Sequence, residues 1–384
     1  MPSPAVGYAA QSKRADLKPL AFQRRDLGPT DVAIQVQFCG VCHSDVHQAR
    51  DEWGNTVFPC MPGHEIVGRV TAVGGAVTRH RVGDVVAVGC MVDSCRACAP
   101  CRAGLEQYCE GPQSFLATYN GPQKPEAAGG GTTKESGYPE NTFGGYSDQV
   151  VVRERFVLRV PDALAAAGNA GLASVAPLLC SAVTTYSPLR HWKAGPGTRV
   201  GVVGLGGLGH VAVRLAKALG AEVTVFTRSK KAKEADARRF GASDVVDHTD
   251  KRAMAAHANS LDLILSTVPE SHDINPFVEL LALDGSLVVV GALGPMKQPT
   301  DNQPVAFHRR TVSGSLIGGI PETQEVLDFC AEHGITSEVE VIPVQQVNDA
   351  YDKVVEGKVR YRYVIDLASL AEDRADAKGD GPVA

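Results

Sequence analysis

The sequence predicts a protein of the α/β class with two domains, one rich in β-strands and one built on a doubly wound parallel sheet. Short β segments broken by Gly and Pro run from Val32 to about Val92. From about Ala173 onward, continuous apolar runs alternate with helical patterns, which is typical of a parallel sheet covered on both faces. The length of 384 residues exceeds that of one ordinary domain, so two domains are expected.

The β segments of the first part lie between Val32 and about Val92 and read VAIQVQF, EIVGRVTAVG and DVVAVGC. Their lengths and the Gly and Pro residues between them predict an all-β, barrel-like unit. Residues 117–145 are poor in periodic apolar residues and rich in Gly and Pro, with a Gly-rich insertion near 121–140. We expect a long exposed loop there that takes no part in a core.

The second part carries the predicted strands RVGVVG, EVTVFT, LDLILST and SLVVVG and the predicted helices HVAVRLAKALG and AKEADARRFGA. After Ser313 the pattern is mixed again, with an amphipathic stretch at TQEVLDFCAEHG and a late strand at RYVIDL. We expect this late strand to rejoin the first unit and residues 370–384 to form a disordered tail.

Charge and composition exclude several classes of protein. A formal net charge of -5 argues against a nucleic-acid binder, because counterion release rewards concentrated Lys and Arg. The first twenty residues lack the apolar core of a signal peptide, and no uninterrupted apolar stretch has the length of a membrane span. A cytoplasmic location is therefore expected, where the ten cysteines are metal ligands, nucleophiles or packing residues rather than disulfide partners.

A glycine-rich turn follows the predicted strand RVGVV and opens the predicted helix HVAVRLAKAL. It fits the pattern G-x-G-x-x-G and consists of Gly204, Leu205, Gly206, Gly207, Leu208 and Gly209. In dinucleotide sites the first Gly permits the tight turn, the second lets the backbone approach the pyrophosphate, and the third lets the helix pack on the strand. A purely structural turn is the alternative, but the strand–turn–helix context favours a dinucleotide site.

The end of the next predicted strand indicates which dinucleotide is bound. An NAD site usually has Asp or Glu there, whereas this chain has Thr227, Arg228 and Ser229, followed by Lys231 and Lys233. Hydroxyl and cationic groups suit the 2′-phosphate of NADP(H). The lysines taken alone are also typical of a solvated helix. The whole segment predicts NADP(H) as the coenzyme.

Four cysteines within a short segment form the pattern CxxCxxCx7C: Cys95, Cys98, Cys101 and Cys109. Four thiolates satisfy the tetrahedral coordination of Zn²⁺ and leave no open position, so such a site stabilises a loop and takes no part in chemistry. An iron–sulfur cluster is the competing interpretation, since compact sets of four cysteines also bind iron and sulfide. Disulfides are disfavoured by the reducing compartment.

The motifs GVCHSDVH, PGHEIVG, LLCSAVTTYSPL, GLGGLGH and GSLIGGIPETQE, together with the four-cysteine segment, occur in one order along the chain. In this series the sequence resembles the zinc-dependent medium-chain dehydrogenase/reductase family, in its cinnamyl alcohol dehydrogenase-like branch with bacterial NADPH-dependent aldehyde reductases. The resemblance covers residues 7–366. The Gly-rich insertion after Tyr119 is longer than is usual for the branch.

The resemblance implies a GroES-like β-rich catalytic domain and a Rossmann coenzyme domain inserted into it. The catalytic domain would comprise residues 1–179 and 317–384, with a structural-zinc lobe at 90–112, and the Rossmann domain residues 180–316. The active-site cleft would lie where the two meet. Members of the family often form homodimers through the edges of their Rossmann sheets, which is an analogy of fold only.

The resemblance also implies a second zinc ion, bound by Cys42, His64 and Cys180, so that two ions are expected per chain. Two cysteines and one histidine leave a fourth position open for water or substrate, as in one known form of catalytic zinc. Spacing alone does not join these residues, because a lone buried Cys is more often a packing residue and a lone His more often a hydrogen-bonded core residue.

The remaining site residues are carried over from the family's motifs. Ser44 and His47 match the proton relay that runs to solvent by way of the coenzyme ribose, and a histidine suits such a relay. Asp45 is expected to orient the His64 imidazole, and Glu65 to approach the zinc during water exchange. Trp53 is expected to line the substrate pocket, and a partly exposed packing residue is the alternative for it. Thr184, Gly314 and Ser315 are expected near the nicotinamide.

The implied activity is hydride transfer between NADPH and an aromatic or aliphatic aldehyde, with zinc acting as a Lewis acid. An NAD(P)-dependent polyol or secondary-alcohol dehydrogenase of the same superfamily is the alternative. A dinucleotide-binding redox or regulatory protein that holds zinc without turnover is a further alternative, disfavoured by the complete set of ligand and relay residues.

Overall fold

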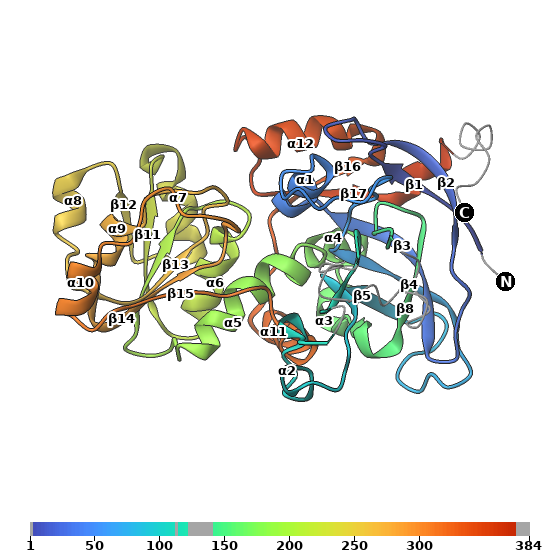
Figure 1. The fold of residues 1–384 in the computed structure, drawn as a ribbon, viewed down its shortest axis with the longest axis horizontal. Helices are drawn as coiled ribbons and strands as arrows, with labels where there is room; N and C mark the ends of the chain where they lie inside the picture. Colours follow the sequence, from blue (N-terminus) through green and yellow to red (C-terminus); the bar gives the residue numbers. More distant parts are fainter. Residues whose placement is uncertain (1–2, 112–113, 122–140, 374–384) are drawn as a thin grey trace. The chain divides into compact units, whose positions relative to one another are not determined.

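The computed structural model describes residues 3–111, 114–121 and 141–373, which form two compact units (Figure 1). The first unit comprises Met1–Cys180, Gly318–Ala331 and Thr336–Ala384, and the second comprises Ser181–Ile317 and Glu332–Ile335. The junctions lie one residue from those expected, and the short segment Glu332–Ile335 groups with the second unit instead of the first.

The first unit is built around a seven-stranded sheet with the order β16-β17-β3-β4-β5-β9, in which β8 also pairs with β3. Two small antiparallel sheets, β1-β2 and β6-β7, accompany it. The strands are β1 (Ser3–Ala9), β2 (Lys18–Arg24), β3 (Asp31–Gly40), β4 (Ile66–Val73), β5 (Val85–Val88), β6 (Met91–Asp93), β7 (Leu116–Ala117), β8 (Gln149–Arg153), β9 (Leu158–Arg159), β16 (Val339–Pro343) and β17 (Arg362–Asp366).

Strand β3 is the centre of this sheet because three neighbours pair with it. Strands β4 and β8 are antiparallel to β3, and the late strand β17 pairs antiparallel with its end, with Val364 opposite Gly40. The alternating pattern of β3 buries Val32, Ile34, Val36 and Phe38, as expected for a half-buried strand. The return of the chain's last strand to the first unit follows the expectation for RYVIDL.

Helices of the first unit lie between or after these strands. They are α1 (His43–Ala49), α2 (Ala99–Arg102), α3 (Asp162–Ala165), α4 (Gly168–Val175), α11 (Ile320–His333, whose last two residues group with the second unit) and α12 (Val347–Val355), with 3₁₀ turns at Glu106–Tyr108, Glu154–Phe156, Val344–Gln346 and Leu367–Ala371.

The second unit is a six-stranded parallel sheet with the order β12-β11-β10-β13-β14-β15, as predicted from the continuous apolar runs. Its strands are β10 (Arg199–Val203), β11 (Glu222–Thr227), β12 (Asp244–Asp247), β13 (Leu261–Ser266), β14 (Leu281–Val289) and β15 (Thr311–Gly314). Its helices are α5 (Val183–His191), α6 (Gly209–Ala218), α7 (Lys230–Phe240), α8 (Lys251–Ala255), α9 (Asn275–Val278) and α10 (Asn302–Phe307).

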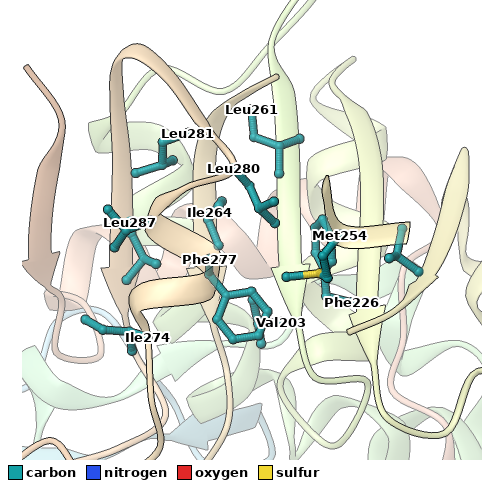
Figure 2. Close-up of a cluster of buried hydrophobic side chains, with 12 residues drawn as sticks. Val203, Phe226, Met254, Leu261, Ile264, Ile274, Phe277, Leu280, Leu281 and Leu287 are labelled. Atoms are coloured by element: carbon teal, nitrogen blue, oxygen red, sulfur yellow. The ribbon is translucent and has the colours of Figure 1, made fainter. Parts of the chain in front are cut away.

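One core of this second unit lies on the sheet face covered by α8 and α9 (Figure 2). Phe226 of β11, Ile264 of β13 and Leu287 of β14 come from the sheet, and Phe277 of α9 and Met254 of α8 pack against them. Strands such as Arg199–Val203 are buried on both faces, which explains why their sequences are continuous apolar runs instead of alternating ones.

The boundaries expected from the sequence are wrong for the exposed loop and for the disordered tail. Residues 117–121 and 142–145 are not an exposed loop, because Tyr119, Asn120 and Thr142 are buried and the Asn120 amide donates to the Thr142 carbonyl at 3.0 Å. Glycine explains the error, since a Cβ on Gly144 would lie 2.3 Å from the Pro62 carbonyl oxygen, so glycine serves close backbone packing here. Residues 122–140, the bulk of the insertion, lie outside the described residues.

The expected tail also begins too early. Leu370 and Ala371 end a 3₁₀ turn, and the Asp373 carboxylate accepts hydrogen bonds from the Tyr8 hydroxyl at 3.0 Å and from Gln345 at 2.7 Å. The physical reason is that short polar residues can be fixed by distant partners, which composition does not reveal. Residues 374–384 lie outside the described part of the chain.

One helical stretch, Gly168–His191, is long and apolar enough to cross a membrane, but all of its most apolar window is buried inside the fold. Core helices of proteins without any membrane span pass the same test of length and composition. Within this stretch the residues Leu178–Ala182 form a π-turn, a widened turn that often occurs at functional sites.

Candidate functional site

The first cluster gathers Cys42, His64, Glu65 and Cys180 from three distant segments of the first unit. Cys42 precedes α1, His64 and Glu65 precede β4, and Cys180 sits on the π-turn. All four are buried, and one ligand atom from each lies within 4.8 Å of the others. The structure therefore brings together the residues that the resemblance assigned to the open zinc site.

The spacing of the sulfur atoms fits a single tetrahedral ion. The Cys42 and Cys180 Sγ atoms are 4.0 Å apart. Two thiolates that bind one zinc at about 2.3 Å are separated by about 3.8 Å at the tetrahedral angle. A hydrogen bond from the Cys180 thiol lowers the pKa of Cys42 well below its usual value, which favours the thiolate that a metal requires.

Asp45 fixes the geometry around this cluster. Its carboxylate is fully buried and accepts four hydrogen bonds, two on each oxygen. The donors are the Cys42 amide at 2.9 Å, the Gly63 amide at 3.0 Å, the His64 Nδ1 at 3.0 Å and the Tyr146 hydroxyl at 3.2 Å. With Nδ1–H bound to Asp45, the Nε2 lone pair of His64 is left for a metal.

Glu65 is held by Arg362 of β17. The guanidinium Nη2 of Arg362 donates to both Glu65 oxygens, at 2.5 and 2.6 Å, and to the Val41 carbonyl at 2.9 Å. Burial raises the pKa of Glu65 to about 7, and the charge of Arg362 opposes that rise. Glu65 thus lies within reach of the cluster while a buried cation fixes its carboxylate.

The expected proton-relay residues occupy one helix. Ser44 and His47 are three residues apart on α1, so they share a face of that helix. The Ser44 hydroxyl is 3.8 Å from the Cys42 Sγ, and the His47 Nδ1 is 2.5 Å from the Glu52 carboxylate. The Trp53 ring packs against the His47 ring with their centroids 5.5 Å apart. Trp53 thus lies beside His47, the histidine expected in the proton relay.

The four-cysteine segment also fits one closed ion. Ligand atoms of Cys95, Cys98, Cys101 and Cys109 all lie within 4.8 Å of one another, and the Cys95 and Cys101 sulfurs are 3.9 Å apart. In a four-iron cluster each thiolate binds a different iron, which requires wider spacing than one ion does. All ten cysteines are free thiols in the structure.

Backbone amides surround these sulfurs. The Cys98 amide donates to the Cys95 Sγ at 3.3 Å, and the Glu110 amide donates to the Cys98 Sγ at 3.4 Å. Backbone hydrogen bonds lower the pKa of Cys98 to about 6, whereas burial raises that of Cys109 to about 12. Amides directed at sulfur are the arrangement expected where thiolates bind a metal.

The glycine-rich turn of the second unit has the geometry that the motif predicts. Gly204 has φ +90°, a conformation that other residues rarely adopt. A Cβ on Gly209 would lie 2.1 Å from the Gly204 carbonyl oxygen, whereas a Cβ on Gly206 would meet nothing within 4 Å. The third glycine therefore permits close packing, and the space beside the second is open, as a pyrophosphate cradle requires.

The segment expected at the 2′-phosphate follows β11 directly. Thr227 ends that strand, Arg228 and Ser229 are exposed, and Lys231 lies on the exposed side of α7. Lys233 Nζ donates to the Leu205 carbonyl at 2.7 Å, so it braces the glycine-rich turn. The alternative interpretation, a lysine that only solvates the helix, accounts for Lys231 but not for Lys233.

The other predicted coenzyme contacts also belong to the second unit. Thr184 is buried on α5. Gly314 ends β15, and the Ser315 amide donates to the Val289 carbonyl at 3.2 Å. Gly314 and Ser315 thus continue the carboxyl edge of the parallel sheet, where open α/β sheets bind their ligands.

Sequence reasoning missed four residues that support these sites: Glu52, Glu106, Tyr146 and Arg362. Glu106 is buried and accepts from the Ile320 amide at 3.0 Å, which joins the four-cysteine lobe to the start of α11. The partners in each pair are far apart in sequence except for His47 and Glu52. For that pair, an acidic residue five positions after the histidine expected in the relay was a usable signal.

Comparison with known proteins identifies the family. The profile described as "Alcohol dehydrogenase GroES-like domain" matches residues 28–162, and the profile described as "Zinc-binding dehydrogenase" matches residues 207–332. The aldehyde reductase YahK of Escherichia coli (strain K12) is 49% identical over 368 residues, which is 96% of this chain and 99% of that protein. The NADP-dependent alcohol dehydrogenase C 1 of Mycolicibacterium smegmatis is 50% identical over 369 residues, again 96% of this chain and 99% of the relative.

Solved structures agree with these relatives. A cinnamyl alcohol dehydrogenase of Sorghum bicolor superimposes with a TM-score of 0.86 at 41% identity, over 95% of this chain and 98% of that one. The cinnamyl alcohol dehydrogenase of Helicobacter pylori complexed with NADP(H) has a TM-score of 0.82 at 38% identity, over 96% and 99%. The chain belongs to the zinc-dependent medium-chain dehydrogenase/reductase family, in its cinnamyl alcohol dehydrogenase-like branch, and is an oxidoreductase of the alcohol dehydrogenase class.

Proposed function

We propose that this protein reduces aldehydes to primary alcohols, reversibly, with NADP(H) as coenzyme and zinc at the cluster of Cys42, His64 and Cys180. The observation that carries the proposal is this cluster: three nitrogen and sulfur donors within 4.8 Å, with no fourth cysteine or histidine in the group. Glu65 is the fourth member, and Arg362 engages its carboxylate. Such a donor set leaves a coordination position for a carbonyl oxygen.

When bound, zinc would supply Lewis acidity toward the carbonyl and NADPH would supply a hydride. The chain's own residues then manage the proton that the new alcohol oxygen must gain. The Ser44 hydroxyl on α1, 3.8 Å from the Cys42 sulfur, would donate this proton. Asp45 holds His64 in one tautomer throughout, and buried walls around the cluster exclude water.

His47 restores the proton to Ser44. Its Nδ1–H is engaged by Glu52 at 2.5 Å, so Nε2 is the nitrogen that exchanges protons. The His47 side chain is 23% exposed, which gives the relay contact with solvent. The Glu52 carboxylate fixes the orientation of the His47 ring during this transfer.

The coenzyme preference is supported by the basic and hydroxyl residues after β11. No carboxylate occupies residues 227–229, and a guanidinium at Arg228 suits a phosphate better than a ribose hydroxyl. The mycobacterial relative is named as NADP-dependent, and the Helicobacter enzyme was solved with NADP(H). Residues 1–179 and 317–384 would form the catalytic domain and residues 180–316 the coenzyme domain.

The experiment that tests the proposal is a panel of aldehydes and alcohols assayed with both coenzymes beside a metal analysis of the purified protein. We expect NADPH-dependent reduction of cinnamaldehyde and benzaldehyde and two zinc ions per chain. NADPH binding without aldehyde-dependent oxidation of the coenzyme would favour a non-catalytic redox or regulatory protein and would contradict the proposal.

A polyol dehydrogenase is the second candidate function. A protein of Mesembryanthemum crystallinum named as a probable mannitol dehydrogenase is 45% identical over 96% of this chain. Trp53, packed against His47, favours a planar substrate over a polyhydroxylated one. A higher kcat/KM for mannitol or sorbitol oxidation than for cinnamaldehyde reduction would select this candidate instead.

We also propose a cytoplasmic homodimer joined through β15. This strand is at one end of the six-stranded sheet, and edge strands present unpaired backbone groups to a partner. Phe307, at the end of α10 just before β15, is 78% exposed, and Leu293, in the segment between β14 and α10, is 58% exposed. Sedimentation of Phe307→Asp should show a monomer, whereas Val341→Asp, on the exposed edge strand β16 of the first unit, should leave a dimer. A wild-type monomer would contradict this.

A further inference from the structure

Two histidines of the second unit lie at the carboxyl edge of its parallel sheet. His248 directly follows β12, and the His272 Nε2 is 3.0 Å from the Ser266 hydroxyl at the end of β13. Both rings pack against Phe277, with centroid separations of 5.6 and 6.4 Å. The carboxyl edge is where open α/β sheets bind nucleotides, so these imidazoles are at the coenzyme side of the sheet.

His248 is the direct neighbour of the segment assigned to the 2′-phosphate. Thr227 of β11 and Asp247 of β12 are register partners, and the His248 amide donates to the Thr227 carbonyl at 3.3 Å. Arg228 and His248 therefore directly follow the paired ends of two adjacent strands. Adjacent strands are about 4.8 Å apart, so an anion held by Arg228 lies within reach of the His248 imidazole.

The charges around His248 keep its ring neutral before coenzyme binds. Burial lowers the pKa of His248 below its usual value, and the positive charge of Arg228 lowers it further. Asp247, on its own strand, acts in the opposite direction, and Lys230 at the start of α7 offsets part of the Asp247 charge. A phosphate of charge -1.5 to -2 entering this group reverses the balance in favour of the imidazolium.

His272 has a different role, because both of its ring nitrogens are engaged within its own loop. Its Nδ1 is 2.8 Å from the Glu270 carbonyl, which can only accept, so Nδ1 carries a proton. Its Nε2 shares a hydrogen bond with the Ser266 hydroxyl. His272 is therefore already held in place, and His248 is the histidine adjoining Arg228.

We propose that His248 takes up a proton from solvent when NADP(H) binds and then acts with Arg228 as the second cationic contact of the 2′-phosphate. The proposal rests on the proposed function, in which NADP(H) is the coenzyme. One proton is gained by the Nε2 or Nδ1 lone pair, and no other bond forms or breaks. NADP(H) affinity then depends on pH through a residue that NAD(H) does not require.

The test is the dissociation constant of NADPH and of NADH for the zinc-loaded protein, measured by fluorescence between about pH 6 and pH 8.5, around the ordinary histidine pKa of about 6.5. Between the free-state and complex-state pKa values the NADPH Kd should rise with pH by up to about tenfold per unit, and NADH should show no such slope. The second ionisation of the phosphate, with a pKa of about 6, acts in the opposite direction and cannot mimic this slope.

The variant His248→Gln should lose the slope and bind NADPH about tenfold more weakly at the acidic end, with its NADH affinity unchanged. Calorimetry at neutral pH in buffers of different ionisation enthalpy should show net proton uptake for the wild type and none for the variant. The matched control is His257→Gln, which changes a histidine bound at 3.2 Å to Asp244, the residue that begins β12. That variant should keep the wild-type slope.

The outcomes separate this inference from the proposed coenzyme preference. If NADPH binds more tightly than NADH but His248→Gln has the wild-type pH profile, the inference is overturned and the preference stands. If NADPH binds no more tightly than NADH at any pH, the preference is wrong and the inference falls with it. The unchanged NADH affinity shows that the variant is folded.

Discussion

Replacing Asp45 by Asn tests whether the buried carboxylate positions His64, which we propose as a zinc ligand. Asn keeps the shape of the side chain but exchanges one acceptor oxygen for an NH₂ donor and removes the charge. If the NH₂ group replaced the oxygen that faces Gly63 and His64, two N–H groups would point at it. The amide should therefore turn its nitrogen toward the Cys42 amide and the Tyr146 hydroxyl, and the hydroxyl can rotate to accept.

The expected loss of stability and of zinc affinity follows from this rotation of the amide. One N–H, that of Cys42, is left buried without an acceptor, which costs about 1–3 kcal/mol. The His64 hydrogen bond changes from a charged to a neutral one and loses about 1 kcal/mol. Loss of such a partner to a metal-binding histidine typically lowers metal affinity about 10–100-fold. Asp45→Asn should therefore stay folded, unfold at a lower temperature and lose zinc faster.

The assay is zinc transfer to a chromogenic chelator, followed together with thermal unfolding. Wild type and variant each hold a closed four-cysteine site, which serves as an internal reference for release. The control is Asp31→Asn, another buried carboxylate of the first unit, which binds Arg25 at 2.5 Å and the Gly28 amide at 2.7 Å. It should lower the unfolding temperature without changing zinc release.

Equal zinc release from Asp45→Asn and the wild type would refute the reasoning, because Asp45 would then stabilise the fold without acting on the metal ligand. A faster release from Asp31→Asn of the same size would refute it as well, because general destabilisation would then explain the loss.

Three further changes test the other sites. Cys98→Ser should reduce the zinc content from two ions per chain to one and lower the unfolding temperature; an unchanged unfolding temperature would argue against a structural metal. Ser44→Ala should slow turnover about 10²–10⁴-fold while zinc content and coenzyme affinity stay the same, and a normal kcat would remove Ser44 from the relay. Arg228→Asp should shift the ratio of kcat/KM values from NADPH toward NADH; a wild type that already favours NADH would contradict the assignment.

The second unit was predictable from sequence because its signals are local. Arg199–Val203, the glycine-rich turn and α6 follow one another directly, and each glycine acts on neighbours within the same motif. The short strands β12 and β15 escaped prediction, because four residues carry too little periodicity to distinguish a strand from a loop. The importance of His248 depends on the register between β11 and β12, which no local pattern contains.

The two cysteine clusters also differ in whether their signal is local in sequence. Cys95, Cys98, Cys101 and Cys109 lie in one short segment, so their spacing alone indicated a metal. The other cluster joins Cys42 to Cys180, and only the resemblance to a family linked them. Arg362 and Tyr146 were not foreseen at all, because their partners Glu65 and Asp45 are distant in sequence and become neighbours only when β17 and the segment before β8 pack on β3 and β4.

The error at the expected loop shows that composition alone does not distinguish exposed from buried glycine-rich segments. Gly and Pro at 117–145 indicated an exposed loop, yet Tyr119 packs against His64, the proposed zinc ligand, with ring centroids 5.5 Å apart. Glycine is common both in mobile loops and where two backbones must touch, and only the neighbours of Gly144 and Gly145 distinguish the two cases.

The most direct test of the central claim is the zinc content and aldehyde reductase activity of Cys180→Ala beside the wild type. We predict that the wild type holds two zinc ions and oxidises NADPH in the presence of cinnamaldehyde. Cys180→Ala should hold one zinc, remain folded and bind NADPH normally, but show no turnover by the near-ultraviolet absorbance of the coenzyme. A kcat near that of the wild type in this variant would contradict the zinc-dependent mechanism.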